Sequence, residues 1–158
     1  VLEASGVVRI LQPFWANTAK RLAKTPKLYF MDTGLACHLT GWNTSDQLRR
    51  GAMAGHMFET FVVSEVLKSY MNAGRDPRNV CFYRDAQKRE IDLVIQDGRT
   101  LHPIEIKAGA NVRVEAIRNF EVLESFKDYE AGFGCVICQT DTPYMLADRV
   151  QAMPVWAI

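Results

Sequence analysis

The chain has 158 residues, of which 48% are hydrophobic and 23% are charged, and its formal net charge is +1. This length suits one compact domain with a short additional segment, and the hydrophobic content excludes an intrinsically disordered chain. No apolar run approaches the ~20 residues that a membrane-spanning helix requires, and no signal-peptide pattern is present. We therefore expect a cytoplasmic protein that does not bind a membrane.

Basic residues gather in the first third of the chain. Residues 1–50 contain seven Lys or Arg and three Asp or Glu, whereas residues 51–158 contain twelve and fifteen. A basic segment of this kind either faces nucleic acid or another partner, or forms a solvated loop. Three of its members are candidate substrate contacts: Lys20, Arg21 and Lys24.

Two strand-like runs lie near the start of the chain. Val7–Gln12 and Lys27–Met31 are joined by a polar, basic loop. Alternating apolar residues on both sides of a polar connection predict a β-hairpin. We expect this hairpin to be an incomplete element.

A short helix is expected next. Asp32 provides an N-cap for a helix over Gly34–Leu39, and Gly41 is suited to ending it. Trp42–Gly55 has little periodicity, which predicts a polar linker without regular structure.

A long amphipathic helix is predicted over Gly55–Met71. It carries a single acid on its apolar stripe, Glu59. The neighbours of Glu59 at helical spacing are Val62, Val63 and Val66. Glu59 is therefore expected to face a sheet rather than open solvent.

The segment REIDLVIQDGRTLHPIEIK, residues 89–107, predicts two strands around a short polar turn. Each strand carries charge among apolar residues: Asp92 in the first, Glu105 and Lys107 in the second. Because side chains alternate across a strand, Glu105 and Lys107 share a face. Burying such groups together is costly unless they have a purpose, and a divalent metal site beside a lysine is one.

The remaining chain completes an α/β core. An amphipathic helix is predicted from apolar residues at helical spacing, Val114, Ile117, Phe120 and Leu123. Phe133–Cys138 is a continuous apolar run typical of a central strand buried on both faces. Met145–Val150 and Pro154–Ile158 are weaker strand candidates. Cys135 and Cys138 cannot share a metal, because residues three apart on a strand face opposite ways.

The order Glu59, Asp92, Glu105-x-Lys107 resembles the PD-(D/E)xK superfamily, which has the restriction-endonuclease-like fold. The runs PKLYFMDTGLACHLTG, GHMFETFVVSEV, FYRDAQKREIDLVI and HPIEIK are similar to an uncharacterised domain at the C-terminus of bacterial and archaeal AAA-type P-loop ATPases. The resemblance implies an α/β core with a mixed central sheet flanked by helices. It assigns 51–158 to a nuclease-like domain and 1–50 to a partial winged-helix-like β-hairpin and linker.

The resemblance also implies a role for each site residue. Asp92 and Glu105 would bind Mg²⁺ or Mn²⁺, with the main-chain carbonyl of Ile106 as a further ligand and Glu59 as an outer or second-metal ligand. Lys107 would orient the attacking water or stabilise developing negative charge. The structural alternative is an inert network of ion pairs on an exposed sheet face.

Arg84 precedes the Asp92 strand and is a further candidate for holding a substrate phosphate. Its alternative is an ion pair with Asp85 or Glu90. Glu90 lies two residues before Asp92, and it is therefore expected on the same strand face.

Two functions remain open from the sequence. One is a metal-dependent phosphodiesterase acting on DNA or RNA, and the other is a non-catalytic module of an ATPase that binds nucleic acid or protein. The chain begins with Val and contains no G-x-x-x-x-G-K-[ST] motif, so we expect it to be part of a longer protein in which ATP binds upstream. An oligomer is compatible with either function.

Overall fold

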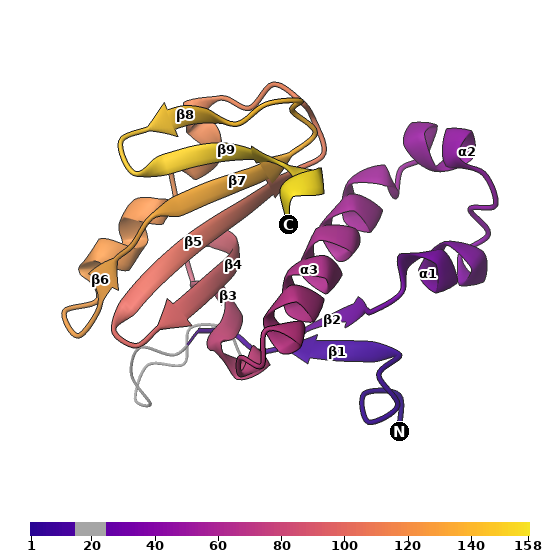
Figure 1. The fold of residues 1–158 in the computed structure, drawn as a ribbon, viewed down its shortest axis with the longest axis horizontal. Coiled ribbons are helices and arrows are strands. Elements are labelled where there is room, and N and C mark those ends of the chain that lie inside the picture. The colour runs from indigo at the N-terminus through magenta and orange to yellow at the C-terminus, as the bar shows by residue number, and fades with distance from the viewer. Residues whose placement is uncertain (15–24) are drawn as a thin grey trace.

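The computed structural model has a mixed α/β architecture, and it describes residues 1–14 and 25–158 (Figure 1). Its strands are β1 (Val8–Leu11), β2 (Lys27–Phe30), β3 (Val80–Arg84), β4 (Glu90–Asp97), β5 (Thr100–Lys107), β6 (Glu130–Ala131), β7 (Gly134–Cys138), β8 (Tyr144–Ala147) and β9 (Val150–Pro154). Its α-helices are α1 (Thr33–Leu39), α2 (Ser45–Arg50) and α3 (Ala54–Asn72). Its 3₁₀ turns are η1 (Pro77–Asn79), η2 (Val114–Ile117), η3 (Phe120–Ser125) and η4 (Val155–Ala157).

A seven-stranded mixed sheet forms the centre of the molecule, in the order β3-β4-β5-β7-β9-β8 with β6 added beside β5. Strands β3, β4 and β5 form an antiparallel meander, whereas β5, β7 and β9 run parallel. None of the helices in the described part of the chain is both long and apolar enough to cross a membrane.

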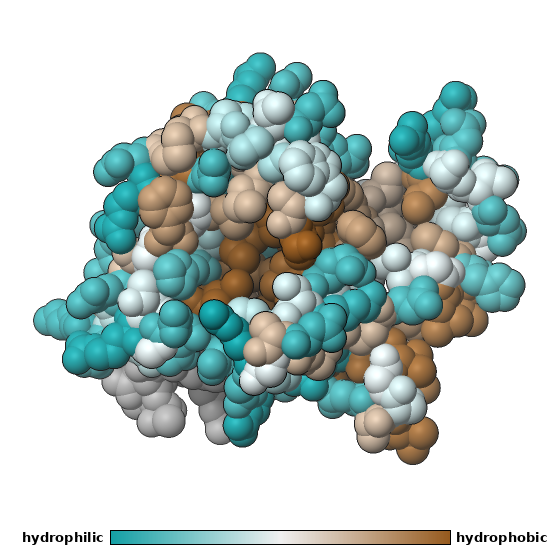
Figure 2. Space-filling view, viewed as in Figure 1, coloured by the Kyte–Doolittle hydropathy of each residue, from teal (hydrophilic) through white to brown (hydrophobic). Residues whose placement is uncertain are grey.

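The helix α3 confirms the prediction over Gly55–Met71 and covers one face of the sheet (Figure 1). Its Val62 and Val63 are fully buried against the sheet residues Leu93 and Ile104. Burying each such side chain stabilises the fold by about 1.5–3 kcal/mol. In Figure 2, hydrophobic residues gather in a central hollow that hydrophilic residues surround.

The predicted N-terminal hairpin is confirmed by the antiparallel pair β1–β2. Its Leu11 and Tyr29 belong to the same hydrophobic core as α3, so the hairpin and the sheet are packed together. Its winged-helix-like character stays a prediction. Three predicted substrate contacts, Lys20, Arg21 and Lys24, lie outside the described residues.

The helix α1 confirms the predicted N-cap, because Asp32 Oδ1 accepts a hydrogen bond from the Leu35 N–H at 3.0 Å. The prediction of an irregular linker over Trp42–Gly55 is wrong in part, since this segment contains α2. Thr44 Oγ1 caps α2 by accepting from the Gln47 N–H at 3.2 Å. A helix this short buries no residue, and its sequence therefore lacks an apolar period.

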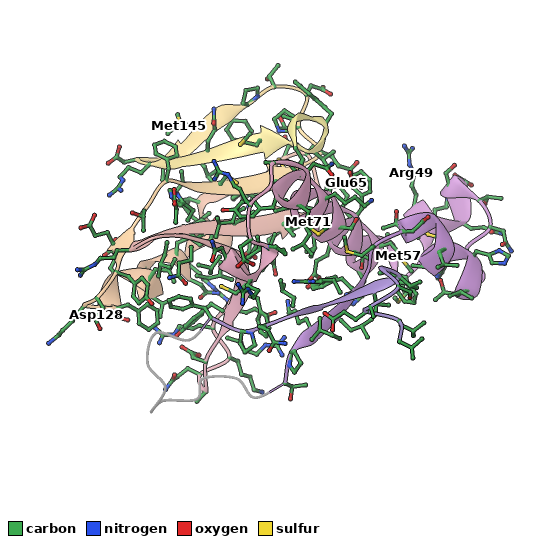
Figure 3. The ribbon with its side chains drawn as sticks, turned by 60° about the horizontal axis from the view of Figure 1, so that its bottom comes forward. Arg49, Met57, Glu65, Met71, Asp128 and Met145 are labelled. Carbon is green, nitrogen blue, oxygen red and sulfur yellow. The ribbon has the colours of Figure 1, made fainter. Side chains whose placement is uncertain are left out.

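A cleft of about 750 Å³ lies where α1, α2 and α3 meet the ends of the sheet. Met57 and Phe61 from α3 give it an apolar wall, and Arg49 from α2 is also among its lining residues. Figure 3 shows Met57 and Arg49 on these two helices. It is separate from the acidic residues that the sequence singled out.

The predicted amphipathic helix over residues 114–123 is wrong, because this segment forms two 3₁₀ turns, η2 and η3. Its apolar residues recur at every third position, which matches the three residues per turn of a 3₁₀ helix better than the 3.6 of an α-helix. Phe120 and Leu123 pack into a second core on the sheet face opposite α3, while Val114 stays exposed.

The predicted strand over Phe133–Cys138 is confirmed by β7, which lies between β5 and β9. The edge strands are displaced from the predicted positions. A left-handed residue, Arg149 with φ 63°, turns the chain from β8 into β9. Pro154–Ile158 is not a strand, because Pro154 ends β9 and a 3₁₀ turn follows.

Candidate functional site

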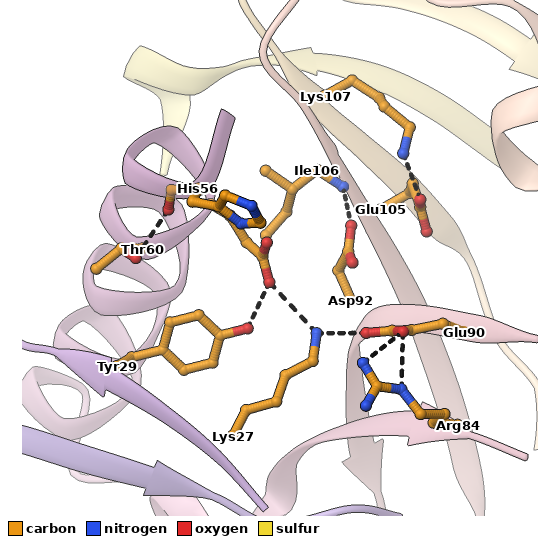
Figure 4. Close-up of polar contacts among 11 residues, drawn as sticks. Lys27, Tyr29, His56, Thr60, Arg84, Glu90, Asp92, Glu105, Ile106 and Lys107 are labelled. Atoms are coloured by element: carbon orange, nitrogen blue, oxygen red, sulfur yellow. Dashed lines mark hydrogen bonds and ion pairs between the residues drawn. The ribbon is translucent and has the colours of Figure 1, made fainter. Parts of the chain in front are cut away.

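Strands β4 and β5 separate at the position of the predicted acids. They pair from Asp97 and Thr100 up to Leu93 and Ile104, and beyond that point β4 pairs only with β3 while β5 pairs with β7. The carboxylate of Asp92 enters the fork between them. Its Oδ2 accepts a hydrogen bond from the main-chain N–H of Ile106 at 2.9 Å (Figure 4). A side chain thus provides the acceptor that a continued strand pairing would have provided.

A bulge in β4 sets the direction of Asp92. Cys81 pairs with Val94 and Tyr83 pairs with Ile91, so β4 has one residue more than β3 between these pairs. Such a bulge breaks the strict alternation of side chains. Ile91 consequently packs in the core opposite α3, whereas Leu93 packs in the core beneath α3. Asp92 lies at the changeover.

Glu105 and Lys107 lie together on the sheet face opposite α3, whereas Glu59 is carried by α3 itself. Ile104 and Ile106 pack beneath α3, and the intervening Glu105 therefore faces the other side of the sheet with Lys107. Glu105 is 9% exposed, and its Oε1 accepts from Lys107 Nζ at 2.6 Å.

Glu59 belongs to α3 and lies within a network of hydrogen bonds and ion pairs that includes Lys27 and Tyr29, both labelled in Figure 4. Its Oε1 accepts from Tyr29 Oη at 2.5 Å and from Lys27 Nζ at 3.3 Å. The same Lys27 Nζ lies 2.6 Å from Glu90 Oε1. Glu59 is therefore bound by β2 residues rather than by a group shared with Glu105.

Arg84 adopts the alternative that the sequence left open. Its Nη2 lies 2.7 Å from Glu90 Oε2, and its Nε donates to the same oxygen at 2.8 Å. Glu90 thus joins Arg84 to Lys27, and the guanidinium of Arg84 is engaged in an ion pair.

The electrostatics of the two central carboxyls favour a bound cation. Burial, followed by the negative charge of Asp92, raises the pKa of Glu105 to about 7, although Lys107 opposes the shift. Burial also raises the pKa of Asp92, and the charge of Glu59 adds to this, while the Ile106 hydrogen bond acts against it. Mutually repelling buried carboxylates are stabilised by a positive ion placed between them.

The carboxylates of Asp92 and Glu105 are chemically suitable donors for Mg²⁺, which is usually held by one or two carboxylates together with waters and substrate phosphate. Within residues 1–14 and 25–158, no three His, Cys, Asp or Glu side chains come together as a metal-binding group. Glu59 therefore does not complete such a group in this arrangement. The main-chain carbonyl of Ile106 stays a predicted ligand.

A cleft of about 760 Å³ opens beside Glu105 and Lys107 on the face opposite α3. The segment after β5 forms its other wall, with Arg113 and Arg118 among the lining residues. Neither arginine forms an ion pair within the described residues. Sequence reasoning missed both: it placed Arg118 among the charged residues of the predicted amphipathic helix, and it gave Arg113 no role. Their closeness in sequence to Lys107 was the signal available.

Comparison with known proteins gives a family but no activity. Residues 54–158 match DUF4143, a domain of unknown function, and residues 1–46 match a second domain of unknown function, DUF8612. Uncharacterised proteins of Mycobacterium tuberculosis and Mycobacterium bovis are each 27% identical over 148 residues, covering 94% of this chain and 32% of the relative. The chain thus spans about a third of the length of these curated relatives. No solved structure matches it. The extent of the first match shows that the chain belongs to the DUF4143 family.

Proposed function

We propose that this domain is a divalent-metal-dependent phosphodiesterase acting on nucleic acid, built on a restriction-endonuclease-like core. One observation carries the proposal: the buried carboxyls of Asp92 and Glu105 have raised pKa values at the fork between β4 and β5, beside Lys107. Acids held in a costly arrangement within a cleft are typical of functional sites. Mg²⁺ or Mn²⁺ is the proposed cofactor.

Each residue has a distinct role in the proposed reaction. When bound, the divalent ion supplies an activated water and neutralises charge on the phosphate. Asp92 and Glu105 hold that ion, and the Ile106 N–H fixes the orientation of Asp92. Lys107 stabilises the negative charge that develops on the phosphoryl oxygens. Arg113, from the other wall of the cleft, binds substrate phosphate.

The proposal extends to the longer protein. The resemblance to the C-terminal domain of AAA-type ATPases supports an upstream ATPase domain in the same polypeptide, where ATP would bind. The relatives are about three times as long as the matched region, which leaves room for such a domain.

A second candidate function is a non-catalytic module of the ATPase that binds nucleic acid or protein. It is favoured by the ion pairs of Lys27 with Glu59 and Glu90, which neutralise two of the acids without any metal. In that case the acidic residues would be a structural network.

Nicking of supercoiled plasmid tests the proposal. The protein is incubated with Mg²⁺ or Mn²⁺, with an EDTA control, beside Asp92→Asn and Glu105→Gln. The exposed Glu121→Gln is the matched control for loss of one carboxylate. Metal-dependent nicking that both site variants lose, and that Glu121→Gln keeps, is the expected result. Equal nicking by all four proteins would show contamination and favour the non-catalytic module.

A further inference from the structure

The ammonium group of Lys27 lies between two carboxylates that come from different elements. It is 3.3 Å from Glu59 Oε1 on α3 and 2.6 Å from Glu90 Oε1 on β4. The Lys27 side chain is only 17% exposed, and its Nζ also lies 5.3 Å from the centroid of the Phe82 ring. Lys27 is therefore an integral part of the acidic centre, and most of its side chain is shielded from solvent.

The balance of charges explains how a charged lysine is accommodated in this position. Burial opposes its charged form, but the ion pairs with Glu90 and Glu59, with a further contribution from Asp92, outweigh burial and raise its pKa. The two ion pairs hold the Lys27 ammonium group between Glu59 and Glu90. Without it, Glu90 would keep only Arg84 as a partner and Glu59 only the Tyr29 hydroxyl.

We propose that Lys27 takes the place of a second divalent cation at this centre. A lysine ammonium is a compact point charge with three donors, and these suit the oxygens that would otherwise bind an ion. Lys27 neutralises the side formed by Glu59 and Glu90, and this leaves Asp92 and Glu105 to hold a single ion. The inference rests on the proposed function, since it defines how many metal ions the same site takes.

The proposal makes the N-terminal hairpin part of the site. Lys27 lies in residues 1–46, outside the DUF4143 match that contains Glu59, Asp92 and Glu105. The metal content of the DUF4143 part therefore depends on a residue from the neighbouring segment.

Manganese binding by Lys27→Met tests the proposal. Free Mn²⁺ is measured by electron paramagnetic resonance during titration, and isothermal titration calorimetry gives an independent stoichiometry. Lys68→Met is the matched control, because Lys68 pairs with Glu65 at 2.7 Å on the outer side of α3. We expect the parent chain and Lys68→Met to bind a single ion and Lys27→Met to bind a second. If Lys27→Met folds only when Mn²⁺ is present, seen as recovery of the helical circular dichroism signal, the ion has replaced the lysine and the proposal is supported.

The other outcomes separate the two proposals. If the parent chain and Lys27→Met each bind a single ion, the inference about Lys27 is overturned while the proposed phosphodiesterase site stands. Binding of two ions by the parent chain has the same consequence. No ion in the parent chain but one in Lys27→Met would support the role of Lys27 and contradict the proposed function. If no variant binds an ion, both the inference and the proposed function are overturned. The same holds if Lys27→Met stays unfolded in the presence of Mn²⁺ while Lys27→Gln folds and binds no added ion.

Discussion

The carboxylate of Asp92 and the main-chain N–H of Ile106 are joined by a 2.9 Å hydrogen bond across the fork between β4 and β5. The bond connects the two strands after their pairing has ended at Leu93 and Ile104. It also fixes Asp92 between the α3 side of the sheet and the cleft beside Glu105. This hydrogen bond therefore holds the two strands together and also keeps a negative charge at the fork. Substitution of Asp92 by Asn or by Ala separates these two effects.

Asp92→Ala and Asp92→Asn are expected to differ in stability. Asparagine keeps an acceptor for the Ile106 N–H and removes a charge whose burial is unfavourable, whereas alanine leaves the N–H without this partner. Loss of a partner for a buried donor costs about 1–3 kcal/mol. In urea unfolding of the metal-free chain, the free energy of unfolding of Asp92→Asn should therefore exceed that of Asp92→Ala by that amount. Equal midpoints for the two would contradict a role of this hydrogen bond in holding the fork.

The raised pKa of Glu105 predicts a pH dependence of stability without metal. The folded state holds the Glu105 proton up to about pH 7, while the unfolded state releases it near 4.5. Between these values the native state binds more protons, so the free energy of unfolding falls as pH rises. The loss is on the order of a few kcal/mol and is complete above pH 7. Denaturation at several pH values should show that Glu105→Gln lacks this fall in the free energy of unfolding. If Glu105→Gln has the same pH dependence as the parent chain, the raised pKa does not belong to Glu105.

Arg113→Ala and Arg118→Ala are expected to weaken binding of nucleic acid. Fluorescence anisotropy with a labelled single-stranded oligonucleotide in EDTA measures binding apart from hydrolysis. Removing one arginine that neutralises a phosphate should reduce the steepness of log K against log salt by about 0.7. Arg50→Ala, which removes an exposed arginine from α2, is the control and should leave the slope unchanged. Unchanged slopes for both cleft variants would place the nucleic acid elsewhere.

Tyr29→Phe is expected to destabilise the chain through Glu59. The Tyr29 hydroxyl donates to Glu59 Oε1 at 2.5 Å, and burial together with this bond raises the pKa of Tyr29. A hydrogen bond to a charged group contributes about 1.5–3 kcal/mol. Equilibrium unfolding should show a loss in this range, while Tyr70→Phe on α3 should change little. If Tyr29→Phe leaves the free energy of unfolding unchanged, Lys27 alone holds Glu59.

Local sequence patterns predicted most of the elements that the structure contains. The valines of α3, the Asp32 cap and the apolar run of β7 each act through neighbours in sequence, and a linear pattern is sufficient for such features. The segment 114–123 was misassigned because a spacing of three residues is compatible with two kinds of helix. The helix α2 was missed because it buries nothing.

The sequence by itself determined the candidate acids and lysine and the strands that carry them. Only the tertiary structure decided how they meet. The bulge in β4 changed the direction of Asp92, and strand pairing placed Glu105 on the face opposite α3. Lys27 reached Glu59 and Glu90 from far away in the chain. Alternation and periodicity describe neighbours along a strand or helix, but contacts between distant segments depend on register and packing, which no local pattern encodes.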